Sequence, residues 1–315
     1  MISYEQLAAT PSIFPALTGH TQAQFDALFT DFQQAHARRT AQATHTKRKL
    51  RPRQRAPGAG HPFRLPLRDR LLLTLVWLRV YPTSALLGWL FGLDKSNAWH
   101  NVPEVLATLP GMASFPFERP APERRQLGSK QEVLDAFPQV RVIIDSTEQP
   151  FHRLEGWANQ KPFYSGKKKR HTVKAQSACT PEGRVAAVGP SGPGSTHDLA
   201  LLRGSGLLDH LEAGEGAMTD RGYVGLQDDR PDREVVTPHQ ASTGHPLTGA
   251  QKAFKRVVSG CRVVVEHLLA QGKRFQVLRQ VSRSVFGRHG QVFRVVALLV
   301  DRRLATKPLT SFATS

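Results

Sequence analysis

The chain has 315 residues, of which 43 are Lys or Arg and 25 are Asp or Glu, so its formal net charge is +18 at pH 7. A hydrophobic content of 40% is ordinary for a folded protein and excludes a disordered basic tail. Two cysteines, Cys179 and Cys261, exclude a disulfide framework and a cysteine-based zinc site. A ribosomal or membrane-surface protein would share the positive charge, but a folded enzyme that acts on nucleic acid fits the composition better.

No segment predicts insertion into a membrane. The N-terminus lacks a charged region followed by an apolar core, and the most apolar stretch, Leu71 to Leu78, is too short to span a bilayer. We therefore expect a cytoplasmic protein that is associated with the nucleoid.

The first 65 residues predict a helical segment followed by a linker. Residues 1–35 carry Phe25 and Phe32 on one helical face. Residues 36–65 are basic, contain no acid and end among Pro and Gly, which is typical of an exposed linker or arm. DNA contact through this arm and a solvated linker with incidental charge are equally good interpretations. The arm residues expected to touch DNA are Lys47, Arg48 and Lys49.

Residues 66–110 predict three short helices with tight turns. The first runs from Leu67 to Leu78, the second follows a cap at Thr83 or Ser84, and the third opens at Lys95. This spacing resembles a helix-turn-helix that binds DNA, with an ordinary three-helix packing unit as the alternative. The large apolar residues Trp77, Trp89 and Phe91 are expected in its core.

A Pro-rich linker, 111–136, separates this module from a larger region, 137–305, which a short tail, 306–315, follows. Strand patterns occupy 140–145, 171–178 and 184–188, the last two joined as a hairpin. Further strands at 217–219 and 234–238 alternate with a helix from Asp198 and a long helix that begins at a Thr248–Gln251 capping box and closes near Gly272. This order predicts a mixed α/β sheet with packed helices.

Three acids of this larger region suit a metal site. Asp145 and Asp220 each end a short apolar strand pattern, and Glu266 lies beside the apolar stripe of the long helix. Each acid alone has an ordinary explanation: a strand-end cap, a turn residue, or a surface Glu paired with Arg262 four residues earlier. Together they can converge on two Mg²⁺ ions, for which Mn²⁺ would substitute.

Five ordered blocks of the larger region carry a family resemblance. They are Ile144–Glu148, Tyr164–His171, Gly194–Asp198, Asp220–Gly225 and the Val265-Glu266-His-Leu-Leu block. With them, residues 144 to about 304 resemble the catalytic domain of DDE transposases of bacterial insertion sequences, the branch similar to Harbinger-type enzymes. The resemblance implies a ribonuclease-H-like fold, with Asp145, Asp220 and Glu266 as the catalytic metal-binding triad. It also supports the helix-turn-helix module before the domain.

Other residues near the triad are expected to play supporting parts. Asp198 is interpreted as a helix cap and a possible neighbour or alternative to the metal ligands, and His197 as structural rather than a general base. Trp157 either packs on a base or is buried. A basic track beside the metal site is expected to hold the DNA backbone. Its members are Lys167, Lys168, Lys169, Arg170 and Arg262.

The resemblance implies a DNA transposase. Such an enzyme binds terminal inverted repeats, cleaves at the element ends by two-metal hydrolysis and joins the freed 3′-hydroxyl to target DNA. Its partners would be double-stranded DNA and further copies of itself, since two ends must be brought together. An inactive, transposase-derived DNA-binding protein and a ribonuclease-H-like nuclease without strand transfer are the alternatives.

Overall fold

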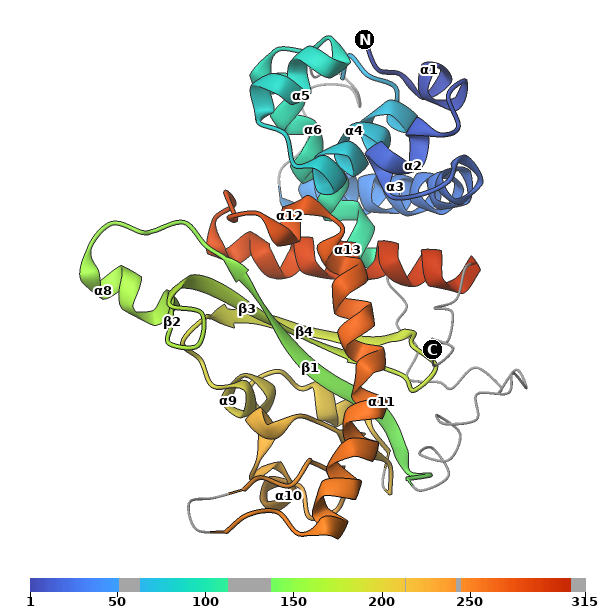
Figure 1. Ribbon diagram of the computed structural model, residues 1–315. Coiled ribbons are helices and arrows are strands. Elements are labelled where there is room, and N and C mark those ends of the chain that lie inside the picture. Colours follow the sequence, from blue (N-terminus) through green and yellow to red (C-terminus); the bar gives the residue numbers. More distant parts are fainter. Residues whose placement is uncertain (51–62, 113–136, 213, 242–244, 307–315) are drawn as a thin grey trace. The chain divides into compact units, whose positions relative to one another are not determined.

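The computed structural model describes residues 1–50, 63–112, 137–212, 214–241 and 245–306 (Figure 1). The chain forms two compact units. The helical unit comprises Met1–Ser114 and Arg274–Val277, and the sheet unit comprises Phe115–Lys273 and Leu278–Ser315. Each unit is described by itself below. Among the described residues, none of the helices has the length and apolar character that a membrane crossing needs.

The helical unit is built around one helix that is buried on all sides. In α4 every side chain from Asp69 to Leu78 is buried, so this helix forms the centre on which the others pack. The other helices of this unit are α1 (Tyr4–Ala8), α2 (Ile13–Thr18), α3 (Gln22–Leu50), α5 (Ser84–Phe91) and α6 (Lys95–Thr108), with α4 itself spanning Leu67–Val80 and the short η1 spanning Leu109–Met112.

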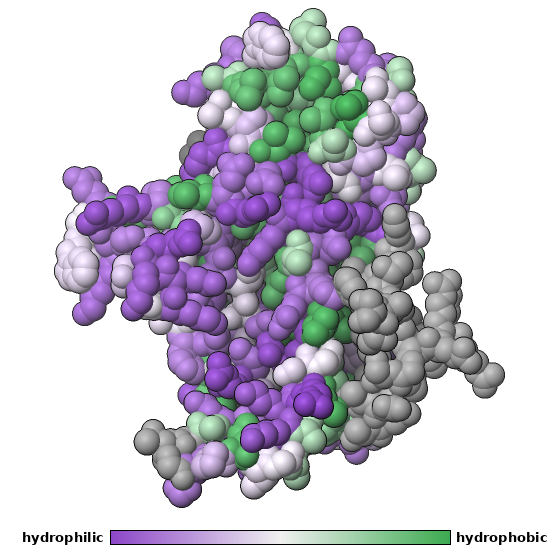
Figure 2. All heavy atoms as spheres, viewed as in Figure 1, coloured by the Kyte–Doolittle hydropathy of each residue, from purple (hydrophilic) through white to green (hydrophobic). Residues whose placement is uncertain are grey.

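The three helices predicted between residues 66 and 110 are present. The Thr83 hydroxyl accepts a hydrogen bond from the Leu86 N–H and caps α5, and the Asp94 carboxylate caps α6. Trp77 and Phe91 lie in the core, but the prediction for Trp89 is wrong, because its side chain is 73% exposed. Figure 2 shows apolar side chains gathered on the surface of this unit.

The N-terminal helical segment is longer than predicted. The expected linker begins at residue 36, yet α3 continues to Leu50. Residues 36–50 contain neither Pro nor Gly and are rich in residues with high helix propensity, so positive charge alone does not end the helix. His36 and Arg39 also bind Glu104 of α6, which holds this part of α3 in place.

The sheet unit contains the predicted mixed sheet. Strand β3 is antiparallel to β1 and β4, whereas β5 is parallel to both β1 and β6, and β2 pairs with the start of β3. This arrangement fits a ribonuclease-H-like α/β fold. The strands are β1 (Val140–Pro150), β2 (Tyr164–Ser165), β3 (Arg170–Cys179), β4 (Val185–Pro193), β5 (Gly216–Met218) and β6 (Val235–Val236).

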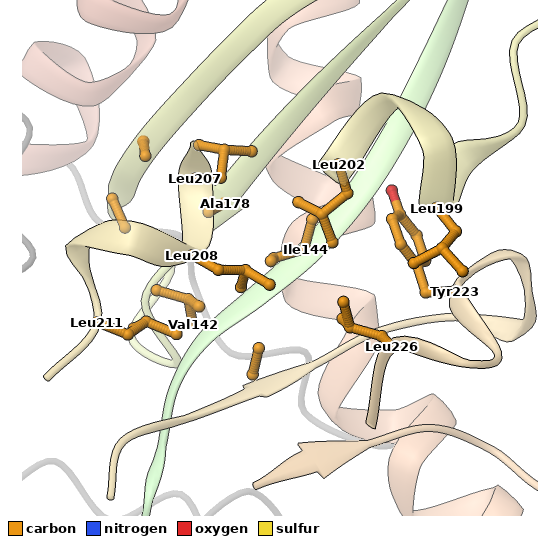
Figure 3. Packing of buried hydrophobic residues seen from close by; sticks show 13 residues of the cluster. Val142, Ile144, Ala178, Leu199, Leu202, Leu207, Leu208, Leu211, Tyr223 and Leu226 are labelled. Atoms are coloured by element: carbon orange, nitrogen blue, oxygen red, sulfur yellow. The ribbon is translucent and has the colours of Figure 1, made fainter. Parts of the chain in front are cut away.

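Helices cover both faces of this sheet. On one face, Ile144 of β1 belongs to a buried cluster that also contains Leu199 and Leu202 of α9 and Tyr223 (Figure 3). On the other face, α11 packs against β1 and β3, and α13 packs against β4. Because successive strand residues point to opposite faces, Ile144 faces α9 and Asp145 faces α11. The helices are α8 (Trp157–Gln160), α9 (Asp198–Arg203), α10 (Leu226–Asp229), α11 (Gly249–Lys273), α12 (Gln276–Arg279, shared between the units) and α13 (Phe286–Thr306).

The capping box that starts α11 is confirmed. The Thr248 N–H donates to Gln251 Oε1 at 2.9 Å, and the Gln251 N–H donates to Thr248 Oγ1 at 3.2 Å. The helix ends at Lys273, one residue beyond the glycine expected to close it. Its position across β1 brings Glu266 and Arg262 to the sheet.

Candidate active site

Asp145 lies within a strand rather than at its end. Strand β1 continues to Pro150, and its residues pair with β3 as far as Pro150 opposite Thr172. The prediction of a strand end at Asp145 is therefore wrong, because pairing with β3 supplies partners for the polar stretch that follows. The Asp145 carboxylate accepts a hydrogen bond from the Ser146 N–H at 2.8 Å, which fixes one of its oxygens.

Asp220 lies next to Asp145 because their strands are parallel neighbours. It follows β5 and begins a short 3₁₀ turn, where its Oδ1 accepts the Gly222 N–H at 2.7 Å. Glu266 comes from a third element, α11, and its side chain is 55% exposed. Three elements far apart in the sequence thus each contribute one carboxylate.

The three carboxylates meet around a single cation. Arg262 Nη2 lies 3.3 Å from Asp145 Oδ2, 4.0 Å from Asp220 Oδ2 and 3.9 Å from Glu266 Oε1. The Arg262 Nε atom is buried without a hydrogen-bond partner. Arg262 was predicted to belong to a basic track that holds the DNA backbone, and its side chain is only 14% exposed. Arg262 lies inside the acid cluster, where its positive charge partly offsets the negative charges of the three carboxylates.

Asp145 is a buried carboxylate beside two other acids. The pKa of its carboxyl group is raised to about 6, chiefly by burial and also by the negative charges of Asp220 and Glu266. Arg262 and the Ser146 N–H act in the opposite direction. A buried carboxylate beside two other carboxylates is stabilised by a nearby cation. Both the burial of Asp145 and the like charges around it therefore favour a cation at this position.

The residues present fit a divalent cation. Carboxylate oxygens are the ligands that Mg²⁺ prefers, and these acids already surround a positive charge. Within the described ranges, no three His, Cys, Asp or Glu side chains are already gathered closely enough to hold a metal ion. Binding would therefore require the carboxylates to close further and Arg262 to move away.

Asp198 is tied to this cluster from the opposite face of the sheet. It was expected to cap α9, but His197 occupies the cap position and Asp198 is the first helical residue. Its Oδ1 accepts the Ser146 hydroxyl at 2.7 Å and lies 2.8 Å from Lys174 Nζ. His197 is exposed, and in the described part of the chain no hydrogen bond of its ring is found. Asp198 is thus linked through Ser146 to the residue next to it, Asp145.

Gly222 separates Asp198 from Asp220. A Cβ atom on residue 222 would lie 2.7 Å from Asp198 Oδ2 and 3.0 Å from Asp220 Oδ1. Both carboxylates therefore approach the same point, and only glycine fits between them. The Asp220-Arg-Gly sequence marks this turn, but only the fold shows that the missing side chain makes room for a second acid.

Several supporting residues had no signal in the sequence. Lys174 has a side chain that is only 9% exposed and pairs with Asp198. Gln176 donates one hydrogen bond to the Asp198 carbonyl at 2.7 Å and one to the Tyr223 hydroxyl at 3.0 Å. Burial raises the pKa of Tyr223, and the charges of Asp198, Asp145 and Asp220 raise it further. Alternation along β3 predicts only which face these residues occupy.

The predicted basic cluster occupies an exposed turn. Residues 166–169 connect β2 to β3, and the side chains from Lys167 to Arg170 are all exposed. Burial lowers the pKa of Lys273, and the positive charge of Lys168 lowers it further, while Asp145 and Glu148 act in the opposite direction. Lys273 therefore lies within electrostatic reach of both the basic turn and the acid cluster. The side chains of Lys47, Arg48 and Lys49, at the end of α3, lie outside the described residues.

Comparison with known proteins agrees with these observations. Residues 144–301 match the model of the DDE superfamily endonuclease, and residues 63–110 match the helix-turn-helix of DDE superfamily endonuclease. The chain is also 28% identical over 251 residues to the probable transposase for insertion sequence element IS702 of Microchaete diplosiphon, covering 79% of this chain and 84% of that protein. No solved structure matches.

The two matched segments contain the three site acids and the three short helices. The endonuclease match covers half of the chain and contains all three acids of the triad, and the helix-turn-helix match covers α4 to α6. The assignment to the Harbinger-like branch stays a prediction. On this evidence the protein belongs to the DDE superfamily endonucleases, as a transposase of the insertion-sequence kind with a helix-turn-helix region for binding DNA.

Proposed function

We propose that this protein is an active transposase that cleaves DNA at the ends of its element and joins the freed 3′-hydroxyl to target DNA. The observation that carries the proposal is the arrangement of Asp145, Asp220 and Glu266 around Arg262 Nη2. An excess of negative charge around one point, on a chain with net charge +18, fits a site that takes cations and a phosphate backbone.

The triad would hold two Mg²⁺ ions, with Mn²⁺ as a substitute. When bound, such ions would activate the attacking oxygen and stabilise the charge that develops on the phosphate. The three carboxylates would hold the ions, and the Ser146 and Gly222 N–H groups orient one oxygen each of Asp145 and Asp220. Arg262 would have to leave the acids for ions to bind there, since the guanidinium and the ions carry the same charge.

The remaining residues position the substrate. Lys273 and the turn that carries Lys168 place positive charge beside the acids, where a phosphate backbone would lie. Lys174 and Ser146 hold Asp198, which acts as a positioning residue for Asp145 through the Ser146 link. The helix-turn-helix, together with the basic end of α3, binds the terminal inverted repeats.

The proposed reaction also implies which molecules the protein binds and where in the cell it acts. Synapsis of two element ends requires at least two copies of the protein on DNA, so we propose a homo-oligomer formed on its substrate. Its place of action is the cytoplasm at the nucleoid, because that is where its DNA lies.

The test is cleavage of a labelled duplex that carries the terminal repeat, with Mg²⁺ or with EDTA, beside a Glu266→Gln variant. We expect metal-dependent cutting at the repeat boundary that the variant loses, followed by products joined to an added target. Cutting without joined products would identify a nuclease without strand transfer. Tight binding of the repeat without cutting, in Mg²⁺ or Mn²⁺, would identify an inactive DNA-binding protein.

A further inference from the structure

A lobe between β1 and β3 projects from the sheet unit and has its own small core. This basic lobe comprises residues 151–171, which include α8, β2 and the first two residues of β3 (Figure 1). The rings of Phe151 and Phe163 stack at 4.9 Å between centroids, and Phe163 meets Phe286 of α13 edge-on at 5.2 Å. Arg153 donates to Gln160 at 2.7 Å and ties the start of the lobe to α8. The lobe is therefore a packed element with a defined outer surface.

That outer surface presents an aromatic side chain to solvent. Trp157, at the start of α8, is 70% exposed, and Tyr164 is 44% exposed. Trp77 of the helical unit, by contrast, is 3% exposed. An exposed indole forgoes a large hydrophobic gain that burial would supply. Its position on a packed lobe is explained if another molecule covers it.

The same surface is strongly basic. The lobe carries six cations and one carboxylate, Glu155. Among the described residues, no ion pair neutralises any of these cations, and all of them are exposed. Figure 2 shows mostly hydrophilic side chains over this part of the sheet unit. The surface therefore suits a polyanion rather than an apolar partner. The six cations are Arg153, Lys161, Lys167, Lys168, Lys169 and Arg170.

The lobe lies close to the acid cluster along the chain. Strand β1 leads from Asp145 to Phe151 at the start of the lobe. At about 3.4 Å per strand residue, these two residues are roughly 20 Å apart. A DNA duplex advances by the same length in about six base pairs. DNA whose scissile phosphate reaches Asp145 can therefore extend over the lobe.

We propose that the basic lobe binds DNA beside the cleavage position and that Trp157 stacks on an unpaired base there. In an intact duplex each base face is covered by its neighbours, so an exposed indole finds a stacking partner only where a base is unpaired or displaced. The six cations hold the backbone on either side. The proposal rests on the proposed function, since it assumes that DNA occupies the acid cluster.

The test measures binding of the full-length protein to two labelled DNAs by fluorescence anisotropy. One is the terminal-repeat duplex, and the other is the same duplex with a short unpaired flank next to the cleavage position. We expect the wild type to prefer the flanked DNA. Trp157→Leu should weaken binding to the flanked DNA by roughly tenfold and leave duplex binding unchanged, whereas Trp157→Phe, which keeps a ring, should stay within about threefold of the wild type.

Two controls make the result decisive. Trp89→Leu removes an equally exposed indole from the helical unit and should not alter the ratio of the two affinities. Since Trp157 is exposed, its variants should melt at the wild-type temperature. A wild type without preference for the flank, or a Trp157→Leu variant that retains it, would overturn the proposal. Unchanged binding of both DNAs by Trp157→Leu would likewise overturn it.

Cleavage is scored in parallel on the same samples. Trp157-dependent binding without any metal-dependent cutting would contradict the proposed function and preserve the assignment of the lobe. Normal cutting with binding that does not depend on Trp157 would support the proposed function and contradict the assignment of the lobe.

Discussion

Charge is arranged in opposite ways in the two units. In the helical unit one carboxylate, Glu104, receives His36 at 2.8 Å, Arg39 at 3.3 Å and a short contact from Arg70. In the sheet unit one cation, Arg262, is surrounded by three carboxylates, and only the 3.3 Å contact with Asp145 is a hydrogen bond.

The difference separates a structural cluster from a functional one. Glu104 joins α3, α4 and α6 through charge-assisted hydrogen bonds, and two arginines surround this one carboxylate. The acids around Arg262 are under-compensated and held by longer contacts, so that site is prepared to gain positive charge. This contrast between the two clusters can be tested by substitutions in each.

The largest effect is expected for Asp145→Asn on DNA cleavage. Losing this ligand should reduce the rate by roughly a thousandfold or more, because several kcal/mol of transition-state stabilisation disappear. Binding to terminal-repeat DNA should be nearly unchanged, and gel shift with a single-turnover cleavage assay measures both. Undiminished Mg²⁺-dependent cutting by this variant would show that Asp145 holds no ion.

Next in size is the loss of stability on Glu104→Ala. Arg70, whose side chain is 7% exposed, would then be buried without its carboxylate partner, which typically costs about 3 kcal/mol. Urea unfolding followed by tryptophan fluorescence reports on this unit, since Trp77, Trp89 and Trp99 all lie in it. Glu104→Gln should lose less, because it keeps a hydrogen-bond acceptor. An unchanged unfolding midpoint for the alanine variant would mean that the cluster does not stabilise the unit.

In the sheet unit, removing the charge of a clustered carboxylate should raise the free energy of unfolding instead of lowering it. Because burial raises the folded-state pKa of Asp145 to about 6, its charge disfavours the folded state increasingly as pH rises from 3.8 to 6, and fully above 6. Asp145→Asn should therefore stabilise the metal-free protein by about 1–3 kcal/mol at pH 7.5, and by little at pH 4. Circular dichroism in EDTA at both pH values measures this. Destabilisation at pH 7.5 would show that the ion pair with Arg262 outweighs burial.

The smallest effect is expected for metal binding by Arg262→Met. Removing the competing cation should tighten Mn²⁺ binding by on the order of tenfold, which corresponds to about 1.4 kcal/mol. Calorimetric titration without DNA measures it, with Arg262→Lys as the charge-conserving control that should stay near the wild type. Equal or weaker Mn²⁺ binding by the methionine variant would contradict the competition between Arg262 and the metal.

Much of the local structure follows from the sequence, because caps and turns depend on neighbours. Thr248 and Gln251 bind one another across three residues, and Thr83 caps α5 in the same way. The order of strands and helices, and the family resemblance of the blocks around Asp145, Asp220 and Glu266, likewise need no knowledge of packing. The family match over residues 144–301 confirms that resemblance.

Other features depend on residues far apart in the chain. Strand β1 continues past Asp145 because β3 pairs with it, and α3 extends to Leu50 with Glu104 of α6 as a partner for its His36. Neither partner is visible in a local pattern, so the boundaries predicted at 145 and 35 were wrong.

Local patterns in the sequence are enough to predict most helices and strands, the family and the three candidate acids. Only the tertiary structure placed Arg262 among those acids, joined Lys174 to Asp198, and exposed Trp157 on a basic lobe. The two kinds of feature differ in how far apart in the chain their causes lie. Helix propensity and capping act within a few residues, whereas ion pairs and burial depend on which distant elements pack together.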